Sequence, residues 1–350
     1  MTQTPQQPWL SAAQLEHGRV RRFGDASGNL AAEVNALATA GLVPLLGTGA
    51  LRITGADRLD FLHGQVSSAV KRLQPGESRN ALMLNVRGHA LALTRVYRRE
   101  DDLFVAAEGG AGAQVEAQLR AHIIFDQVEL HNLSSTLLTF TLQGTDAAAV
   151  LQQVFQGDVG ANLADLPGPD AFAQPPFASA KVLIGPASRS RAGGYDLHVL
   201  SRDAGALVAA LTGAGAVLAG EDALEALRIE AGIAGAELEG GDGVLPQEAG
   251  LEHAVSYRKG CYLGQEIMAR IEARGNLRRR LAGLSLDGLP EAGAKDLVQG
   301  GKTVGRLGGV AEHTRLGIIA LASVRTEVGA GAGLEIGGVN AVLSSLPFGV

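Results

Sequence analysis

The sequence predicts a mixed α+β protein that ends in a small all-β domain. The chain has 350 residues, which is longer than one compact core usually supports, so two or three domains are expected. Between residues 43 and 280, short strand-like runs alternate with amphipathic helical segments. After Leu281 helical periodicity nearly disappears, and short β-like runs are separated by glycines. This change indicates a β-barrel-like domain over residues 281–350.

The individual elements follow a polar lead-in over residues 1–42, the second part of which has a helical pattern. Strand-like runs cover residues 47–54, 81–86, 90–97, 103–106, 128–131, 137–142, 182–184 and 195–200, and in the last domain residues 281–286, 303–307, 318–322 and 341–343. Helical runs cover residues 55–70, 112–122, 146–155, 204–211, 222–232 and 266–273. In the first helical run, apolar side chains recur every three to four residues up to Val70. Residues 156–180 are rich in glycine and proline and predict a loop.

Composition excludes several classes of function. A net charge of −6 gives the chain no general attraction to nucleic acid or to anionic membranes. Its one cysteine, Cys261, excludes an intramolecular disulfide and cannot by itself hold an iron–sulfur cluster or a structural zinc ion. No H-x-x-x-H or C-x-x-C spacing occurs, so no metal site is predicted. The chain shows neither a signal-peptide pattern nor an apolar run of about 18 residues. We therefore expect a cytoplasmic protein without a membrane partner.

Residues 258–266 (RKGCYLGQE) stand apart from the rest of the chain. The only cysteine lies between two glycines and follows two cations. Arg258 and Lys259 would favour the thiolate of Cys261 if they lie near its sulfur, which would raise its reactivity. A free cysteine is also commonly a small buried hydrophobe. A reactive and a structural role for Cys261 therefore both stay open at this point.

The same segment carries a family resemblance. Residues 259–266 (KGCYLGQE) match the signature K-G-C-[FY]-x-G-Q-E of the YgfZ family at every specified position. Other segments resemble the wider aminomethyltransferase superfamily, which includes the T-protein of glycine cleavage: residues 61–65, 227–233, 246–251, 301–305 and 317–322. Together these matches extend over about residues 43–346.

The resemblance implies an aminomethyltransferase-like folate-binding fold, with two interleaved α+β domains over residues 43–280 and a C-terminal β-barrel over residues 281–350. It implies tetrahydrofolate or a derivative as the cofactor. It also implies iron–sulfur enzymes or assembly proteins as partners, support of tRNA modification, and only indirect contact with tRNA. The folate-binding residues that it implies are Arg228, Glu230, Tyr195, Lys259 and Gln265. Its motif residues are Lys259, Gly260, Cys261, Tyr262, Gly264, Gln265 and Glu266, with Cys261 as the reactive one.

Two departures from the superfamily's pattern affect the expected activity. Ala92 and Leu93 stand where the T-protein carries an acidic pair, and neither side chain can move a proton. Ala192 stands where the superfamily has a glutamate that contacts the pterin. We therefore expect a folate-binding accessory protein for iron–sulfur cluster maintenance rather than an enzyme. The alternative is a folate-dependent one-carbon (aminomethyl) transferase that uses another acid.

A basic cluster follows the motif and consists of Arg270, Arg274, Arg278, Arg279 and Arg280. Arginine suits bidentate contacts to anions, so this cluster could hold a folate glutamate tail or an RNA phosphate. A solvated junction between domains is the alternative interpretation. His253, eight residues before Cys261, could form a nucleophilic pair with it, but that spacing on a loop fixes no geometry.

Overall fold

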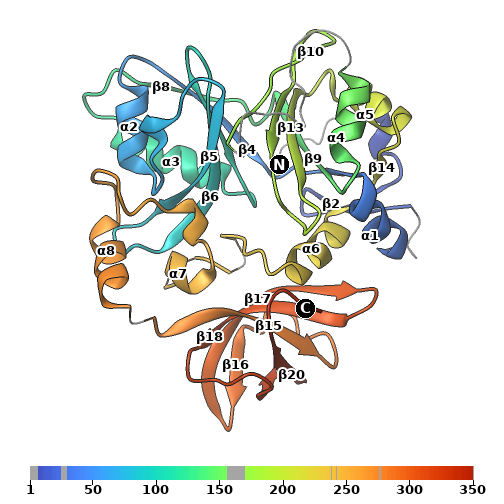
Figure 1. Cartoon of the computed structure of the whole chain (residues 1–350), viewed down its shortest axis with the longest axis vertical. Helices are drawn as coiled ribbons and strands as arrows, with labels where there is room; N and C mark the ends of the chain where they lie inside the picture. The colour runs from blue at the N-terminus through green and yellow to red at the C-terminus, as the bar shows by residue number, and fades with distance from the viewer. Residues whose placement is uncertain are drawn as a thin grey trace. The chain divides into compact units, whose positions relative to one another are not determined.

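The computed structural model describes residues 7–24, 30–155, 170–237, 239–241, 243–275 and 277–349. Among these residues, helices and strands alternate up to residue 274, and the elements after that are strands (Figure 1). Two compact units share the chain. The first takes in the described parts of residues 1–61, 70–79 and 95–224, and the second those of residues 62–69, 80–94 and 225–349. The second unit includes the region predicted as the barrel, so these units differ from the two predicted domains over residues 43–280, and those domains stay a prediction.

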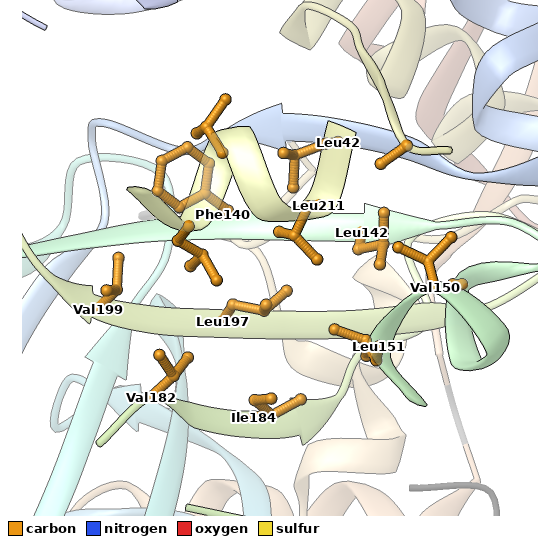
Figure 2. Packing of buried hydrophobic residues seen from close by; sticks show 14 of the residues in the cluster. Leu42, Phe140, Leu142, Val150, Leu151, Val182, Ile184, Leu197, Val199 and Leu211 are labelled. Carbon is orange, nitrogen blue, oxygen red and sulfur yellow. The ribbon is translucent and has the colours of Figure 1, made fainter. Parts of the chain in front are cut away.

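The first unit is built around a five-stranded sheet with the order β12-β13-β9-β3-β14. Its strands are β3 (Gly41–Pro44), β9 (Leu137–Gln143), β12 (Leu183–Pro186), β13 (Gly194–Leu200) and β14 (Val217–Leu218). Its helices are α1 (Leu30–Thr39), α4 (Ala147–Val154) and α5 (Ala204–Gly213). Along β9, Leu138, Phe140 and Leu142 alternate with threonines, so their side chains share one face. Figure 2 shows Phe140 and Leu142 among the buried residues of this core.

A second five-stranded sheet has the order β5-β6-β7-β4-β8. Its strands are β4 (Gly49–Thr54), β5 (Glu77–Leu84), β6 (Ala90–Arg98), β7 (Leu103–Ala107) and β8 (Glu129–Asn132). Helix α3 (Gly112–His122) packs on β4, β7 and β8. Gly49 and Gly112 allow this packing, because a Cβ atom on Gly49 would lie 2.3 Å from the Cα atom of Gly112.

The lead-in contains a hairpin that the sequence did not indicate. Strands β1 (Ala13–Glu16) and β2 (Arg19–Phe23) pair around His17 and Gly18, which both have positive φ. The buried carboxylate of Glu33 in α1 accepts the backbone N–H of Phe23 at 2.7 Å. Hairpin and helix thus belong to one local structure within the first unit. A short 3₁₀ helix, η1 (Pro8–Leu10), precedes them.

The chain ends in a closed barrel with the strand order β15-β18-β17-β16-β19-β20, which confirms the predicted all-β domain. Its strands are β15 (Arg279–Leu286), β16 (Asp296–Gln299), β17 (Lys302–His313), β18 (Gly317–Arg325), β19 (Gly333–Ile336) and β20 (Val339–Ser344). Apolar side chains from these strands fill its interior, with Leu284 and Leu297 fully buried. The sequence missed β16 and β19, which have four residues each and too little alternation to identify.

The helix predicted over residues 55–70 is shorter in the structure: α2 (Arg58–Gln65) ends five residues earlier. After it, Val66 forms a β-bridge with Met83 of β5, and Ser67 bonds to residues far away in sequence. Its backbone N–H donates to the carbonyl of Leu82 at 3.0 Å, and its hydroxyl donates to the carbonyl of Ala254 at 2.6 Å. These bonds compete successfully with continuation of the helix.

The remaining elements are η2 (Val70–Arg72), β10 (Pro176–Phe177), β11 (Ala180–Lys181), α6 (Glu221–Glu230), α7 (Pro246–Ala249), η4 (Glu252–Ala254) and α8 (Gln265–Arg274). Of the predicted loop over residues 156–180, the part up to residue 169 lies outside the described residues, and β10 and β11 form a small hairpin in the rest. None of the described helices combines the length and the apolar character needed to cross a membrane.

Candidate functional site

The signature segment connects η4 to α8 in the second unit, and its lysine points inward. The residue Lys259 is only 9% exposed. Its Nζ atom donates to the backbone carbonyls of His63, of Val66 at 2.6 Å and of Ser68 at 3.1 Å. An ammonium group has three N–H donors. The three donors of Lys259 therefore match the three carbonyl oxygens that it contacts.

These carbonyls belong to the end of α2 and the residues that follow it. The last carbonyls of a helix have no partner within the helix and carry the negative end of its dipole, so a cation is favourable there. The Nζ atom of Lys259 also lies 4.7 Å from the ring centroid of Tyr262, which adds a cation–π contact. Burial nevertheless lowers the pKa of Lys259 to about 7. The carbonyls and the ring thus oppose the loss of charge that burial favours.

The other end of the segment is fixed by Gly264 and Tyr262. Gly264 precedes α8 with φ of +83°, and a Cβ atom there would lie 2.7 Å from the carbonyl oxygen of Asn85. Only glycine combines this φ with such a close approach at low cost. The Tyr262 side chain is buried in an apolar cluster with Leu82 and Met268.

Cys261 lies between these two fixed points and is exposed. Gly260 is exposed as well, and its position for a Cβ atom has open space around it. The structure therefore places the thiol at the surface of the second unit, on a loop held from both sides. The ammonium of Lys259, which the sequence suggested as a neighbour that would favour the thiolate, is directed at the carbonyl oxygens instead. Of the other motif residues, Gln265 is half-buried and Glu266 is exposed.

Arg228, an implied folate-binding residue, forms five hydrogen bonds inside the second unit. Its guanidinium donates twice to Glu225, twice to Glu239 and once to the carbonyl of Ile233. An arginine has five N–H donors. Burial alone would lower the pKa of Arg228, but Glu225 and Glu239 outweigh it and raise the pKa above its usual range. This arrangement uses the donor capacity of Arg228 for the chain's own structure.

Glu230, a second implied folate-binding residue, connects α6 to the barrel within the same unit. Its carboxylate accepts from Arg315 at 3.0 Å and lies 3.3 Å from Nε2 of His313. Nδ1 of His313 accepts from two backbone N–H groups, so Nε2 carries the proton and faces the carboxylate. The backbone carbonyl of Glu230 also accepts from the N–H of Phe348 at 2.9 Å.

Tyr195, the remaining implied folate-binding residue, belongs to the first unit and lies on β13 beside the core of that unit. Burial raises the pKa of its phenol. The next residue, Asp196, is buried and forms a bidentate pair with Arg189, at 3.1 and 2.6 Å. Burial would raise the pKa of Asp196, but Arg189 outweighs it and the pKa is lowered. Asp196 is thus an ionised partner of Arg189.

The positions at which the expected acids are missing differ in their exposure to solvent. Ala92 and Leu93 on β6 are 1% and 7% exposed, and Leu93 packs in an apolar cluster. Ala192 is exposed in the turn before β13. No cluster of three or more potential metal-ligating side chains occurs among the residues that the structure describes.

The carbonyls that receive Lys259 are the part of this site that sequence reasoning missed. Val66 lies 193 residues before Lys259, and a backbone carbonyl leaves no mark in the residue type. In the sequence, residues 61–65 (FLHGQ) show only a family resemblance. The sequence offered one signal: residues 61–65 and Lys259 both lie in segments that resemble the same superfamily.

Comparison with known proteins fits this organisation. A family model described as the GCVT N-terminal domain matches residues 7–259, and one described as the CAF17 C-terminal beta-barrel domain matches residues 278–347. The aminomethyltransferase of Thermus thermophilus is 30% identical over 313 residues, which cover 86% of this chain and 84% of that protein. A putative chloroplastic transferase of Arabidopsis thaliana is 27% identical, and the matched region spans 76% of this chain but 60% of that protein.

Among solved structures, the glycine cleavage system aminomethyltransferase T of Bartonella henselae superposes with a TM-score of 0.81. The match covers 96% of this chain and 94% of that one at 20% identity, so it shows the shared fold. The predicted aminomethyltransferase-like fold with a C-terminal barrel is therefore confirmed. Because the first family model covers more than half of the sequence, the chain belongs to the GCVT family, and its last domain matches the barrel of CAF17.

Proposed function

We propose that this chain is a folate-binding accessory protein of the YgfZ type, which supports iron–sulfur cluster assembly or maintenance and tRNA modification. The observation that carries the proposal is the exposed thiol of Cys261 on a loop fixed by Lys259 and Gly264. A cysteine that served only packing would be buried. A held and exposed thiol suits contact with another molecule, and the CAF17-type barrel at the end of the chain supports the same assignment.

The cofactor that we propose is tetrahydrofolate or a derivative. Membership of the GCVT family and the similarity to proteins named aminomethyltransferases support it. Within the second unit, Gln265 is the proposed contact whose amide group suits a pterin or its tail. Arg228 and Lys259 would support the folate site indirectly, by holding other parts of the chain in place. Their N–H donors are occupied by groups of the chain itself.

Aminomethyl transfer is the rival function, and the buried Ala92 and Leu93 argue against it. A proton at the reacting nitrogen needs a group that can hold it within hydrogen-bond reach. Neither a methyl group nor an isobutyl group can do so, and both side chains are buried. The role that remains is to bind a folate without transferring its one-carbon unit.

The proposed partners are iron–sulfur enzymes or their assembly proteins, which would approach the Cys261 loop, with tRNA reached indirectly through them. We place the protein in the cytoplasm, since an exposed single cysteine suits a reducing compartment. No membrane is part of the proposal.

Calorimetric titration of the purified protein with tetrahydrofolate tests the cofactor. We expect saturable binding at micromolar ligand for the unchanged chain and for Cys261→Ala alike, because the thiol serves a later step. Absence of binding at millimolar ligand would remove folate from the proposal.

A second measurement separates the two functions. The protein is supplied with tetrahydrofolate and with lipoyl protein carrying the aminomethyl group, and formation of methylenetetrahydrofolate is followed. We expect no turnover, with a bona fide aminomethyltransferase as the positive control. Turnover by the unchanged chain would establish the rival.

A further inference from the structure

The barrel carries a cavity of about 680 Å³ that the proposed function does not use. It lies within the second unit, where β15 and β18 pair. Its lining residues are Leu277, Arg278, Arg279, Arg325, Thr326 and Glu327. The volume is in the range of small-molecule sites, and three of the six lining side chains are guanidinium groups.

Strand register concentrates these charges. Arg279 and Arg325 are direct partners in the antiparallel pairing of β15 with β18, and the carbonyl of Arg278 accepts the N–H of Thr326 next to them. Like charges directly opposite each other destabilise an antiparallel pair. Such an arrangement is costly unless an anion compensates it.

The chain supplies few negative charges to compensate the positive charge of these arginines. Glu327 lies 3.5 Å from Arg325, and both side chains are more than half exposed, so this pair contributes little. Among the described residues, Arg278 and Arg279 take part in no ion pair. The adjacent Arg280 differs, since its guanidinium donates to the carbonyl of Val328 at 3.0 Å. The lining therefore carries three positive charges and one negative charge.

We propose that this cavity binds a small phosphate-bearing molecule with two or more negative charges, through Arg278, Arg279 and Arg325. Planar guanidinium groups bind phosphate oxygens in pairs, and two or three of them converging on one cavity favour a diphosphate or triphosphate over a single carboxylate. The hydroxyl of Thr326 adds a further donor at the same place. An RNA backbone is the less favoured occupant, because the chain as a whole has a net charge of −6.

The test is calorimetric titration of the full chain with inorganic pyrophosphate, at low and at moderate salt. The variant carries Arg279→Gln and Arg325→Gln together. The matched control is Arg306→Gln, an exposed arginine on β17 that lies opposite Asp296 and Ser323 and is not part of the lining. We expect saturable binding by the unchanged chain and the control, and at least tenfold weaker binding by the double variant.

Thermal unfolding without ligand shows that the double variant is folded. Removing two opposed like charges should leave its melting temperature equal to or above that of the unchanged chain. Pyrophosphate should raise the melting temperatures of the unchanged chain and of the Arg306→Gln control, but not that of the double variant. Citrate and a short single-stranded RNA serve as comparison ligands.

Three results would overturn the proposal. The first is no pyrophosphate binding at millimolar concentration, and the second is equal binding of citrate, which would show a site for any polyanion. Tighter binding of the RNA than of pyrophosphate, lost in the same double variant, would assign the cavity to nucleic acid. The proposed function rests on Cys261 and on titration with tetrahydrofolate, so none of these outcomes decides it.

Discussion

Arg228 and Lys259 are two buried cations of the same unit with opposite surroundings. The guanidinium of Arg228 is enclosed by the carboxylates of Glu225 and Glu239, and the side chain of Glu239 is fully buried. The ammonium of Lys259 has three carbonyl oxygens and one aromatic face instead. The first cation is compensated by formal charge, and the second only by dipoles. This difference suggests a purely structural role for Arg228 and a positioning role for Lys259 beside an exposed thiol.

The largest effect should follow from Arg228→Met. It leaves two carboxylates without their cation, one of them with no exposure to solvent, and breaking a buried ion pair costs about 3–5 kcal/mol. We expect denaturant unfolding to show a loss of that size. Arg315→Gln is the matched control, because its guanidinium also pairs with a carboxylate, that of Glu230, but is itself 76% exposed. A loss below about 1 kcal/mol for Arg228→Met would contradict the structural role.

Lys259→Met should have a smaller effect on stability. The variant keeps the length of the side chain but removes three hydrogen bonds to the carbonyls of residues 63, 66 and 68, and a buried unsatisfied group costs about 1–3 kcal/mol. We expect a loss of about 2–3 kcal/mol at neutral pH in denaturant unfolding. The thiol of Cys261 should also react at a different rate with a disulfide reagent, since its loop loses one anchor. An unchanged thiol rate would contradict the positioning role.

Gly260 and Gly264 lie on the loop that carries Cys261, and substitutions there test how firmly this loop is held. Gly264→Ala places a methyl group at positive φ and 2.7 Å from a carbonyl oxygen, so a loss of about 1–2 kcal/mol is expected. Gly260→Ala places its methyl group in open space and serves as the control, with a change within about 0.5 kcal/mol. Equal melting temperatures for the two variants would show that Gly264 does not fix the loop.

The last prediction is a pH dependence of stability. Burial lowers the pKa of Lys259 from 10.5 to about 7. Between these pH values the unfolded chain binds more protons than the folded chain, so this group makes the free energy of unfolding rise as the pH increases from about 7 toward 10. The unchanged chain should show this rise relative to Lys259→Met in denaturant unfolding. Parallel curves for the two proteins over that interval would show that burial leaves this amine's affinity for protons unaltered.

The sequence predicted the parts of this molecule that rest on local patterns. Alternating apolar residues identified β9 and most barrel strands, and the octapeptide signature placed the site. The helix predicted up to Val70 was too long, since α2 ends at Gln65. The apolar spacing continues past Gln65, but Ser67 bonds to residues far away in sequence.

Long-range contacts also explain what the sequence left open at the site. The cation of Lys259 is directed at carbonyls about 190 residues earlier in the chain, so neighbouring residue types could not place it. The donors of Arg228 are occupied by Glu225, which is near in sequence, and by Glu239, whose burial no local pattern reveals. The exposure of Cys261, on a loop that Lys259 and Gly264 hold from both sides, supports the reactive role that we propose.

The most direct test of the central claim concerns Cys261 in living cells. In cells that lack this protein, the activity of iron–sulfur enzymes and the level of thiomethylated tRNA are measured after return of the unchanged chain, of Cys261→Ser or of the control Arg306→Gln. We predict restoration by the unchanged chain and the control, and loss of most of it with Cys261→Ser at equal protein level and equal folate binding. Full restoration by Cys261→Ser would contradict the account.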